Sequence, residues 1–342
     1  MSSISRRKFI PLVGTALVGA ASLSFERSNT KHISSTILLP KRLKKGDTIG
    51  IAATAGPIQE KKEVEEFQNI LHDLGYKTKL GKHVFGQFGY FSASDEERAS
   101  EFMELISDDE VHGIFFIRGG WGCARILDLL DYQVIAQHPK IVMGFSDMTA
   151  LLNAITYKTG LVTFHGLGGN STWNDYSVKY IERLLQDAEK ITFKNTSADT
   201  SIISYSSGKN EGICFGGNLS VLCGILGSKY VPDWTGKILF LEDVAEEPYR
   251  IDRMLTQLKL AGVFDQISGL ILGNFRNCVP EDPKRSFTLE EMFEQHFSSA
   301  KIPVFYGAQI GHIRNKFTIP LGVNVRMDAD LGTIEMLEVG VA

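Results

Sequence analysis

The chain has 342 residues, of which 43% are hydrophobic and 22% are charged, with a formal net charge of −4 at pH 7. This length is sufficient for two domains with separate hydrophobic cores. The mildly acidic balance and the lack of a basic stripe argue against a nucleic-acid-binding protein, so no nucleic acid partner is expected.

The first segment has the features of an export signal. Arg6 and Arg7 precede an apolar run over residues 10–25 that is interrupted only by small residues and Pro11. A charged region followed by such a run is typical of a twin-arginine-type signal. The run is shorter than the roughly 20 apolar residues of a spanning helix. We therefore expect residues 1–36 to be a signal peptide and linker, and the protein to be periplasmic without a stable membrane anchor after processing. An uncleaved N-terminal anchor is the alternative.

The next part of the chain alternates between strands and helices. Strands are predicted at 48–53, 77–80, 113–117 and 141–145, and helices at 60–74, 94–107 and 149–157. This alternation indicates a parallel sheet with helices on both faces. The uninterrupted apolar run 114–117 fits a strand that is buried on both sides. We predict an N-terminal α/β domain over residues 37–175.

A more polar stretch separates this domain from a second α/β unit. Residues 176–210 are predicted to be an inter-domain linker, and residues 211–342 a C-terminal domain. Within it, strands are expected at 211–215, 237–242 and 269–273, and helices at 219–226, 250–261 and 289–297. The four cysteines lack metal-ligand spacing, so no metal or other cofactor is expected and no disulfide is required.

Ser146 is the first candidate for chemistry, in the segment Gly144-Phe145-Ser146-Asp147. A serine at the carboxyl end of a parallel strand lies where open α/β sheets place their sites. The following helix N-terminus offers unpaired N–H groups, which suit a developing oxyanion. The alternative is structural, because a serine before a helix is often its N-cap.

A glycine turn, Gly119-Gly120-Trp121-Gly122, follows the strand that ends at residue 117. Glycines at a strand end allow backbone amides to approach a ligand closely. A phosphate-binding loop is the competing interpretation, but the spacing is not GxGxxG and no GK[ST] follows. A simple tight connection is the remaining alternative.

A general base and an orienting carboxylate have more than one candidate each. His312 follows Gly311 in a glycine-flanked loop, whereas His165 closes a predicted strand. Glu242 ends an apolar strand, where a charge is costly unless it is paired. Asp243 is its neighbour and its rival. The residues alone leave a structural role open for each of them.

Seven motifs, taken together and in order, resemble the LD-carboxypeptidase family, which includes muramoyltetrapeptide carboxypeptidases and microcin-immunity relatives. They occupy residues 46–51, 118–122, 144–151, 216–219, 241–244 with 248–255, 271–275, and 311–312 with 320–322. The resemblance extends from Leu38 to the C-terminus. It implies a catalytic triad with Ser146 as nucleophile, His312 as base and Glu242, rather than Asp243, as carboxylate.

The resemblance also implies an oxyanion hole, a fold and an assembly. The oxyanion hole falls on the backbone N–H groups of Gly120 and Asp147. The implied fold is an N-terminal flavodoxin-like parallel-sheet domain plus a smaller C-terminal α/β domain of the swivelling type, with the triad across their junction. A homodimer is expected. Two positions depart from the family pattern: Leu167 stands where relatives often have proline, and Cys123 stands where serine is frequent.

The expected activity is that of a serine carboxypeptidase. It would hydrolyse the L,D-peptide bond that releases terminal D-alanine from a murein tetrapeptide, in cell-wall turnover or recycling. One alternative is a self-immunity-type peptidase that cleaves peptidyl or aminoacyl nucleotides, with an aromatic clamp from Trp121, Trp173 or Trp234. A second alternative is a non-catalytic exported binding protein that keeps the fold.

Overall fold

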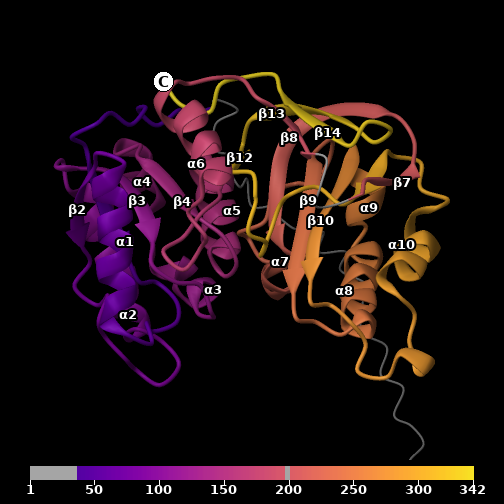
Figure 1. Cartoon of the computed structure of the whole chain (residues 1–342), viewed down its shortest axis with the longest axis horizontal. Coiled ribbons are helices and arrows are strands. Elements are labelled where there is room, and N and C mark those ends of the chain that lie inside the picture. The colour runs from indigo at the N-terminus through magenta and orange to yellow at the C-terminus, as the bar shows by residue number, and fades with distance from the viewer. Residues whose placement is uncertain (1–36, 197–200) are drawn as a thin grey trace, which may run out of the picture. The chain divides into compact units, whose positions relative to one another are not determined.

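The structure, a computed structural model, describes residues 37–196 and 201–342. The predicted export signal over residues 1–36 lies outside the described residues. None of the helices in the described ranges is long and apolar enough to cross a membrane. The described chain forms two β-sheets with helices packed on them (Figure 1).

The first sheet has the strand order β12-β5-β4-β3-β1-β2. Its strands are β1 (Thr48–Ala52), β2 (Lys77–Leu80), β3 (Val111–Phe116), β4 (Ile141–Gly144), β5 (Thr163–His165) and β12 (Ile319–Leu321). The first five are mutually parallel, and β12 pairs antiparallel with β5. All four residues of β4 are buried, as expected for a central strand that is covered on both faces.

Helices connect the strands of this sheet. They are α1 (Lys61–Asp73), α2 (Asp95–Ser107), α3 (Cys123–Ile126), α4 (Tyr132–Gln137), α5 (Met148–Thr159) and α6 (Asp175–Ile181), with a 3₁₀ turn at Leu127–Leu129 and a π turn at Glu182–Gln186. The apolar face of α1 is buried through Val64, Phe67 and Leu71. A capping box starts α2, in which Ser94 and Glu97 each accept the other's backbone N–H.

The second sheet has the strand order β6-β14-β13-β8-β9-β10-β11-β7. Its strands are β6 (Thr192–Lys194), β7 (Ile203–Ser206), β8 (Lys209–Asn218), β9 (Ile238–Val244), β10 (Gly269–Arg276), β11 (Val304–Tyr306), β13 (Asn324–Asp328) and β14 (Thr333–Met336). Strands β8 to β11 are parallel, and the outer strands are antiparallel. The helices are α7 (Leu219–Ile225), α8 (Pro248–Leu260), α9 (Val263–Gln266) and α10 (Leu289–Phe297), with a 3₁₀ turn at Pro283–Arg285.

Two features of the topology differ from the simple sequence-based division. The stretch predicted as a linker contains α6, β6 and β7, and these two strands form the outer edges of the second sheet. Strand β12 comes from the C-terminal part of the chain but belongs to the first sheet. Strands β6, β7 and β12 have only three or four residues each, and unlike β2 and β4 they do not alternate with predicted helices. The predicted domain boundaries themselves remain predictions.

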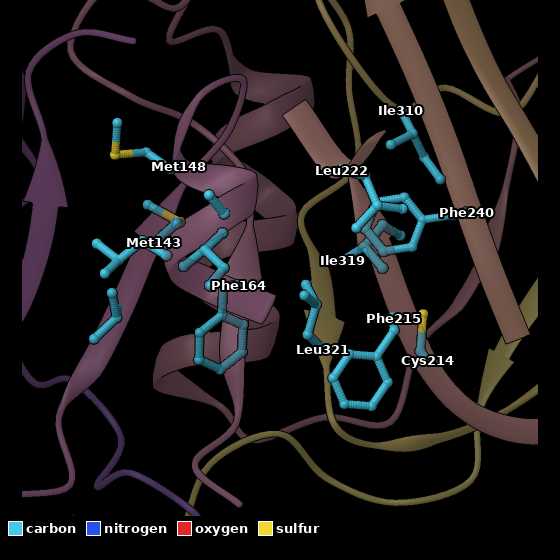
Figure 2. Close-up of a cluster of buried hydrophobic side chains, with 14 of the residues drawn as sticks. Met143, Met148, Phe164, Cys214, Phe215, Leu222, Phe240, Ile310, Ile319 and Leu321 are labelled. Atoms are coloured by element: carbon cyan, nitrogen blue, oxygen red, sulfur yellow. The ribbon is translucent and has the colours of Figure 1, made fainter. Parts of the chain in front are cut away.

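The two sheets share a layer of buried apolar side chains, shown in Figure 2. The labelled members are Met143, Met148, Phe164, Cys214, Phe215, Leu222, Phe240, Ile310, Ile319 and Leu321. They come from β4, α5 and β5, from β8, α7 and β9, and from β12, with Ile310 in the loop between β11 and β12. Burial of this layer holds the strand ends of the two sheets together.

Polar contacts add a specific connection between helix α5 and strand β8. The Asn153 Nδ2 donates to the carbonyl of Gly216 at 2.8 Å, and the N–H of Gly216 donates back to Asn153 Oδ1 at 3.3 Å. The N–H of Asn218 donates to Thr149 Oγ1 at 2.9 Å. Because α5 begins at Met148, two residues after Ser146, these bonds fix the helix of the candidate nucleophile to the second sheet.

Candidate active site

Ser146 lies in the turn between β4 and α5. Its φ is 62°, a left-handed value that is uncommon for a residue other than glycine. The N-cap of α5 is Asp147, and in the described chain the Ser146 hydroxyl caps no helix N–H. The structural interpretation of Ser146 as an N-cap is therefore not supported. Such backbone strain concentrates at functional sites.

The glycine turn packs directly on Ser146. A Cβ at Gly119 would lie 3.0 Å from Ser146 Oγ, so only glycine leaves the hydroxyl its space. The N–H of Gly56 donates to the carbonyl of Gly119 at 3.1 Å and holds the turn. The predicted oxyanion donors, the N–H groups of Gly120 and Asp147, donate no hydrogen bond within the part of the chain that the structure describes.

The side chain of Asp147 supports the same turn, a role that the sequence did not reveal. It is fully buried, and its Oδ2 accepts the N–H of Cys123 at 2.8 Å. Burial raises the pKa of Asp147, while hydrogen bonds from the Cys123 and Gly122 N–H groups oppose the increase. Cys123 is itself buried, which raises the pKa of its thiol and leaves it unreactive.

Glu242 and His312 meet at the carboxyl end of β9. Glu242 Oε2 lies 2.7 Å from His312 Nδ1, and the carboxylate is fully buried. Burial by itself raises the pKa of Glu242, but the hydrogen bond and charge of His312, with nearby His165 and Lys316, bring it below its usual value. Gly311 has a φ of 117°, and a Cβ there would lie 2.6 Å from Glu242 Oε2. The close approach of the loop to the carboxylate therefore requires glycine.

The rival carboxylate, Asp243, faces another part of the structure. It accepts the Asn218 side-chain amide at 3.0 Å and the Ser220 N–H at 3.0 Å. Burial raises the pKa of Asp243 to about 6. Asp243 thus supports the start of α7, and Glu242, not Asp243, is the carboxylate that contacts His312.

His312 also lies beside the turn that carries Ser146. The rings of His312 and Phe145 have centroids 4.9 Å apart. No hydrogen bond joins Ser146 to His312 in the described residues. Catalytic hydrogen bonds are often long without a substrate, so this separation is compatible with a nucleophile and its base.

His165 lies behind Glu242 rather than in the open part of the site. It is 2% exposed, and its Nε2 lies 3.9 Å from Glu242 Oε1. Burial lowers the pKa of His165 to about 4, so this imidazole is neutral above that pH. Its ring packs edge-on against Phe240 at 5.2 Å. His165 therefore contributes packing around Glu242, and the candidate base is His312.

A cavity of about 490 Å³ opens beside His312. It is lined by Phe145, Asn170, Ser171, Thr172, Arg276, His312, Ile313, Arg314 and Lys316. The sequence marks none of the three cations in this lining as a functional residue. They come from the end of β10 and from an irregular loop, where no periodic pattern or motif marks a charged residue as part of a site.

The three tryptophans considered for an aromatic clamp have different environments. Trp234 is buried, and Trp173 packs on Phe67 with ring centroids 5.5 Å apart. Trp121, next to Gly120 in the glycine turn, is 44% exposed. Of the three, Trp121 alone presents a substantial surface to a ligand.

Comparison with known proteins identifies related chains. A family model for the LD-carboxypeptidase N-terminal domain matches residues 49–166, and one for the C-terminal domain matches residues 211–327. A Bacillus subtilis protein named "probable murein peptide carboxypeptidase" is 38% identical over 91% of this chain and 98% of its own length.

Solved structures agree with these sequence matches. The structure of MccF in complex with glutamyl sulfamoyl guanosine superposes with a TM-score of 0.82 at 30% identity, covering 89% of this chain and 100% of that one. A muramoyltetrapeptide carboxypeptidase from Oxalobacter formigenes superposes with a TM-score of 0.74 at 28% identity, covering 84% of this chain and 97% of that one. The predicted family and the predicted two-domain α/β fold class are confirmed.

Proposed function

Because the chain belongs to the LD-carboxypeptidase family, we propose that it is a serine carboxypeptidase that releases terminal D-alanine from murein tetrapeptides by hydrolysing an L,D-peptide bond. The observation that carries this proposal is the buried Glu242–His312 pair, joined at 2.7 Å beside the strained turn of Ser146. A nucleophile, a base and an orienting carboxylate together form the catalytic triad of enzymes that transfer an acyl group through a serine.

In the proposed mechanism, His312 Nε2 takes the Ser146 proton as Oγ attacks the carbonyl carbon. The N–H groups of Gly120 and Asp147 bind the oxyanion that develops. His312 then gives the proton to the leaving amine of D-alanine, and water hydrolyses the acyl-enzyme by the same steps in reverse. Glu242 keeps the proton on His312 Nδ1, so that Nε2 is free to act as a base.

The relatives support two different substrates. The names of the Bacillus subtilis and Oxalobacter formigenes proteins favour murein peptides. The similarity to MccF, together with the exposed Trp121 beside the glycine turn, supports a second candidate, cleavage of an aminoacyl or peptidyl nucleotide. We favour murein because the predicted signal at residues 1–36 would export the protein to the wall compartment. A periplasmic homodimer is part of this proposal.

The test is release of D-alanine from purified murein tetrapeptide, with Ser146→Ala as the control. The wild type should release D-alanine, and the variant should lose on the order of 10⁶ in kcat, as for other triads. Release by both proteins, or by neither, would contradict the proposal. An aminoacyl-nucleotide analogue in a parallel assay distinguishes the second candidate. Absence of labelling of Ser146 by a fluorophosphonate would instead favour a non-catalytic binding protein.

A further inference from the structure

The cavity beside His312 carries a concentration of positive charge. Arg276, Arg314 and Lys316 contribute to its wall, and no acidic residue does so among the described residues that line it. None of these three cations forms an ion pair within 4.0 Å in the described chain. Cations on a protein surface are often solvated individually, but three in one wall, none of them in a direct ion pair, create a field that attracts an anion.

Lys316 shows that this charge is built into the structure. Lys316 is only 4% exposed, and its Nζ lies 3.9 Å from the centre of the Phe145 ring. A buried ammonium is costly unless a partner stabilises it. The ring face of Phe145 and the buried charge of Glu242 provide part of that stabilisation, and Arg276 opposes it.

The two arginines are anchored close to the candidate base. Arg276 Nη1 donates to the backbone carbonyl of His312 at 2.9 Å. The carbonyl of Arg314 accepts the side-chain amide of Asn174 at 3.3 Å, which holds the loop while leaving the guanidinium unpaired. These contacts position both side chains at the same cavity wall as Lys316.

The proposed chemistry determines which part of a substrate occupies this cavity. His312 must protonate the leaving amine, so the residue after the scissile bond has to lie against His312. Phe145, which precedes the candidate nucleophile, and His312 both line the cavity. The residue that is released therefore enters it, and in a carboxypeptidase substrate that residue ends in a free carboxylate.

We propose that Arg276, Arg314 and Lys316 bind the free α-carboxylate of the released residue and so restrict the enzyme to C-terminal residues. This inference rests on the proposed function and deepens it. Guanidinium and ammonium groups form charge-assisted hydrogen bonds with carboxylates. A neutral C-terminal amide, or a chain that continues as a peptide bond, would leave the three cations without a partner.

The experiment compares murein tetrapeptide ending in free D-alanine with the same peptide ending in D-alaninamide. The wild type should favour the acid in kcat/KM by about 10- to 100-fold, the range expected for hydrogen bonds between charged groups. Lys316→Met, which retains a side chain of similar length against Phe145, and Arg314→Gln should each reduce that preference. The reduced preference should come mainly from a higher KM for the acid, with little change in the KM for the amide.

Arg285→Gln is the matched control, because Arg285 lines a separate hollow with Tyr249 and Phe287. It should keep the full preference for the acid. Fluorophosphonate labelling of Ser146 at an unchanged rate shows that the triad of each variant is intact. Equal hydrolysis of acid and amide by the wild type would overturn this inference alone. An equal loss of activity on both substrates in the Lys316 and Arg314 variants would also overturn it. If the wild type hydrolyses neither peptide, the proposed function is wrong as well.

Discussion

At the residue scale, Glu242 and Asp243 are adjacent in sequence but differ in environment. Only Glu242 reaches His312, while Asp243 accepts hydrogen bonds from Asn218 and Ser220. Glu242→Gln should lower kcat by about 10⁴-fold, because an amide would favour the wrong imidazole tautomer, as in another serine peptidase. Asp243→Asn should have a much smaller effect. Kinetics of the two variants measure this difference, and equal losses would contradict the assignment of Glu242.

Lys316, which lines the proposed carboxylate site, also affects the stability of the fold. Burial lowers the pKa of Lys316 to about 8 from its ordinary value of 10.5. Between these two pH values the unfolded chain binds a proton that the folded chain has lost, so stability rises with pH across this window. At pH 7 the buried charge costs at most about 3 to 4 kcal/mol, since one pKa unit corresponds to about 1.4 kcal/mol.

Lys316→Met should therefore melt at a higher temperature than the wild type at pH 7, while it loses preference for the acid substrate. The difference in melting temperature should shrink at pH 10, where the wild-type amine is neutral. Glu242 is the anion and Arg276 the cation that act on this amine, and both remain charged in this window. Thermal melts at the two pH values provide the measurement, and a variant less stable than the wild type at pH 7 would refute the prediction.

At the element scale, the turn before α5 and the glycine turn form one unit through Asp147. Asp147→Asn keeps the backbone N–H at this position but weakens the hydrogen bond that the carboxylate accepts from Cys123. We expect kcat to fall by about 10- to 100-fold, because displacement of the Gly120 N–H weakens an oxyanion donor. Labelling of Ser146 by fluorophosphonate should slow in proportion. Full activity of the variant would show that the glycine turn holds its position without this carboxylate.

At the same scale, some elements and site residues could be predicted from the sequence and others could not. Helices α1 and α2 could be predicted within a few residues because buried residues recur on one face, and β9 because it is a continuous apolar run. Motif resemblance singled out Glu242 over Asp243, a choice that composition and spacing left open. The cationic wall was missed, because Arg276 and Lys316 come from separate segments that only the fold brings together.

At the scale of the whole molecule, the proposed triad is divided between two sheets that α5 and β8 connect. Thr149→Val removes the acceptor of the buried Asn218 N–H, which should destabilise the fold by about 1–3 kcal/mol. It should also lower kcat, because Ser146 would shift relative to His312. Thr149→Ser retains the hydroxyl and should keep most of the activity. Denaturant unfolding and D-alanine release measure the two effects, and equal behaviour of Val and Ser would argue against this hydrogen bond.

Strand β12 has a consequence for how the protein is made. Ile319 pairs with His165, so the first sheet receives its last strand from a segment that the ribosome adds more than 150 residues later. Until then β5, with Phe164 at its centre, presents an open edge to which another chain could add. Contacts this distant in sequence also slow folding. A fragment that stops before β12 should therefore aggregate during synthesis, and co-expression of a segment that contains β12 should keep it soluble.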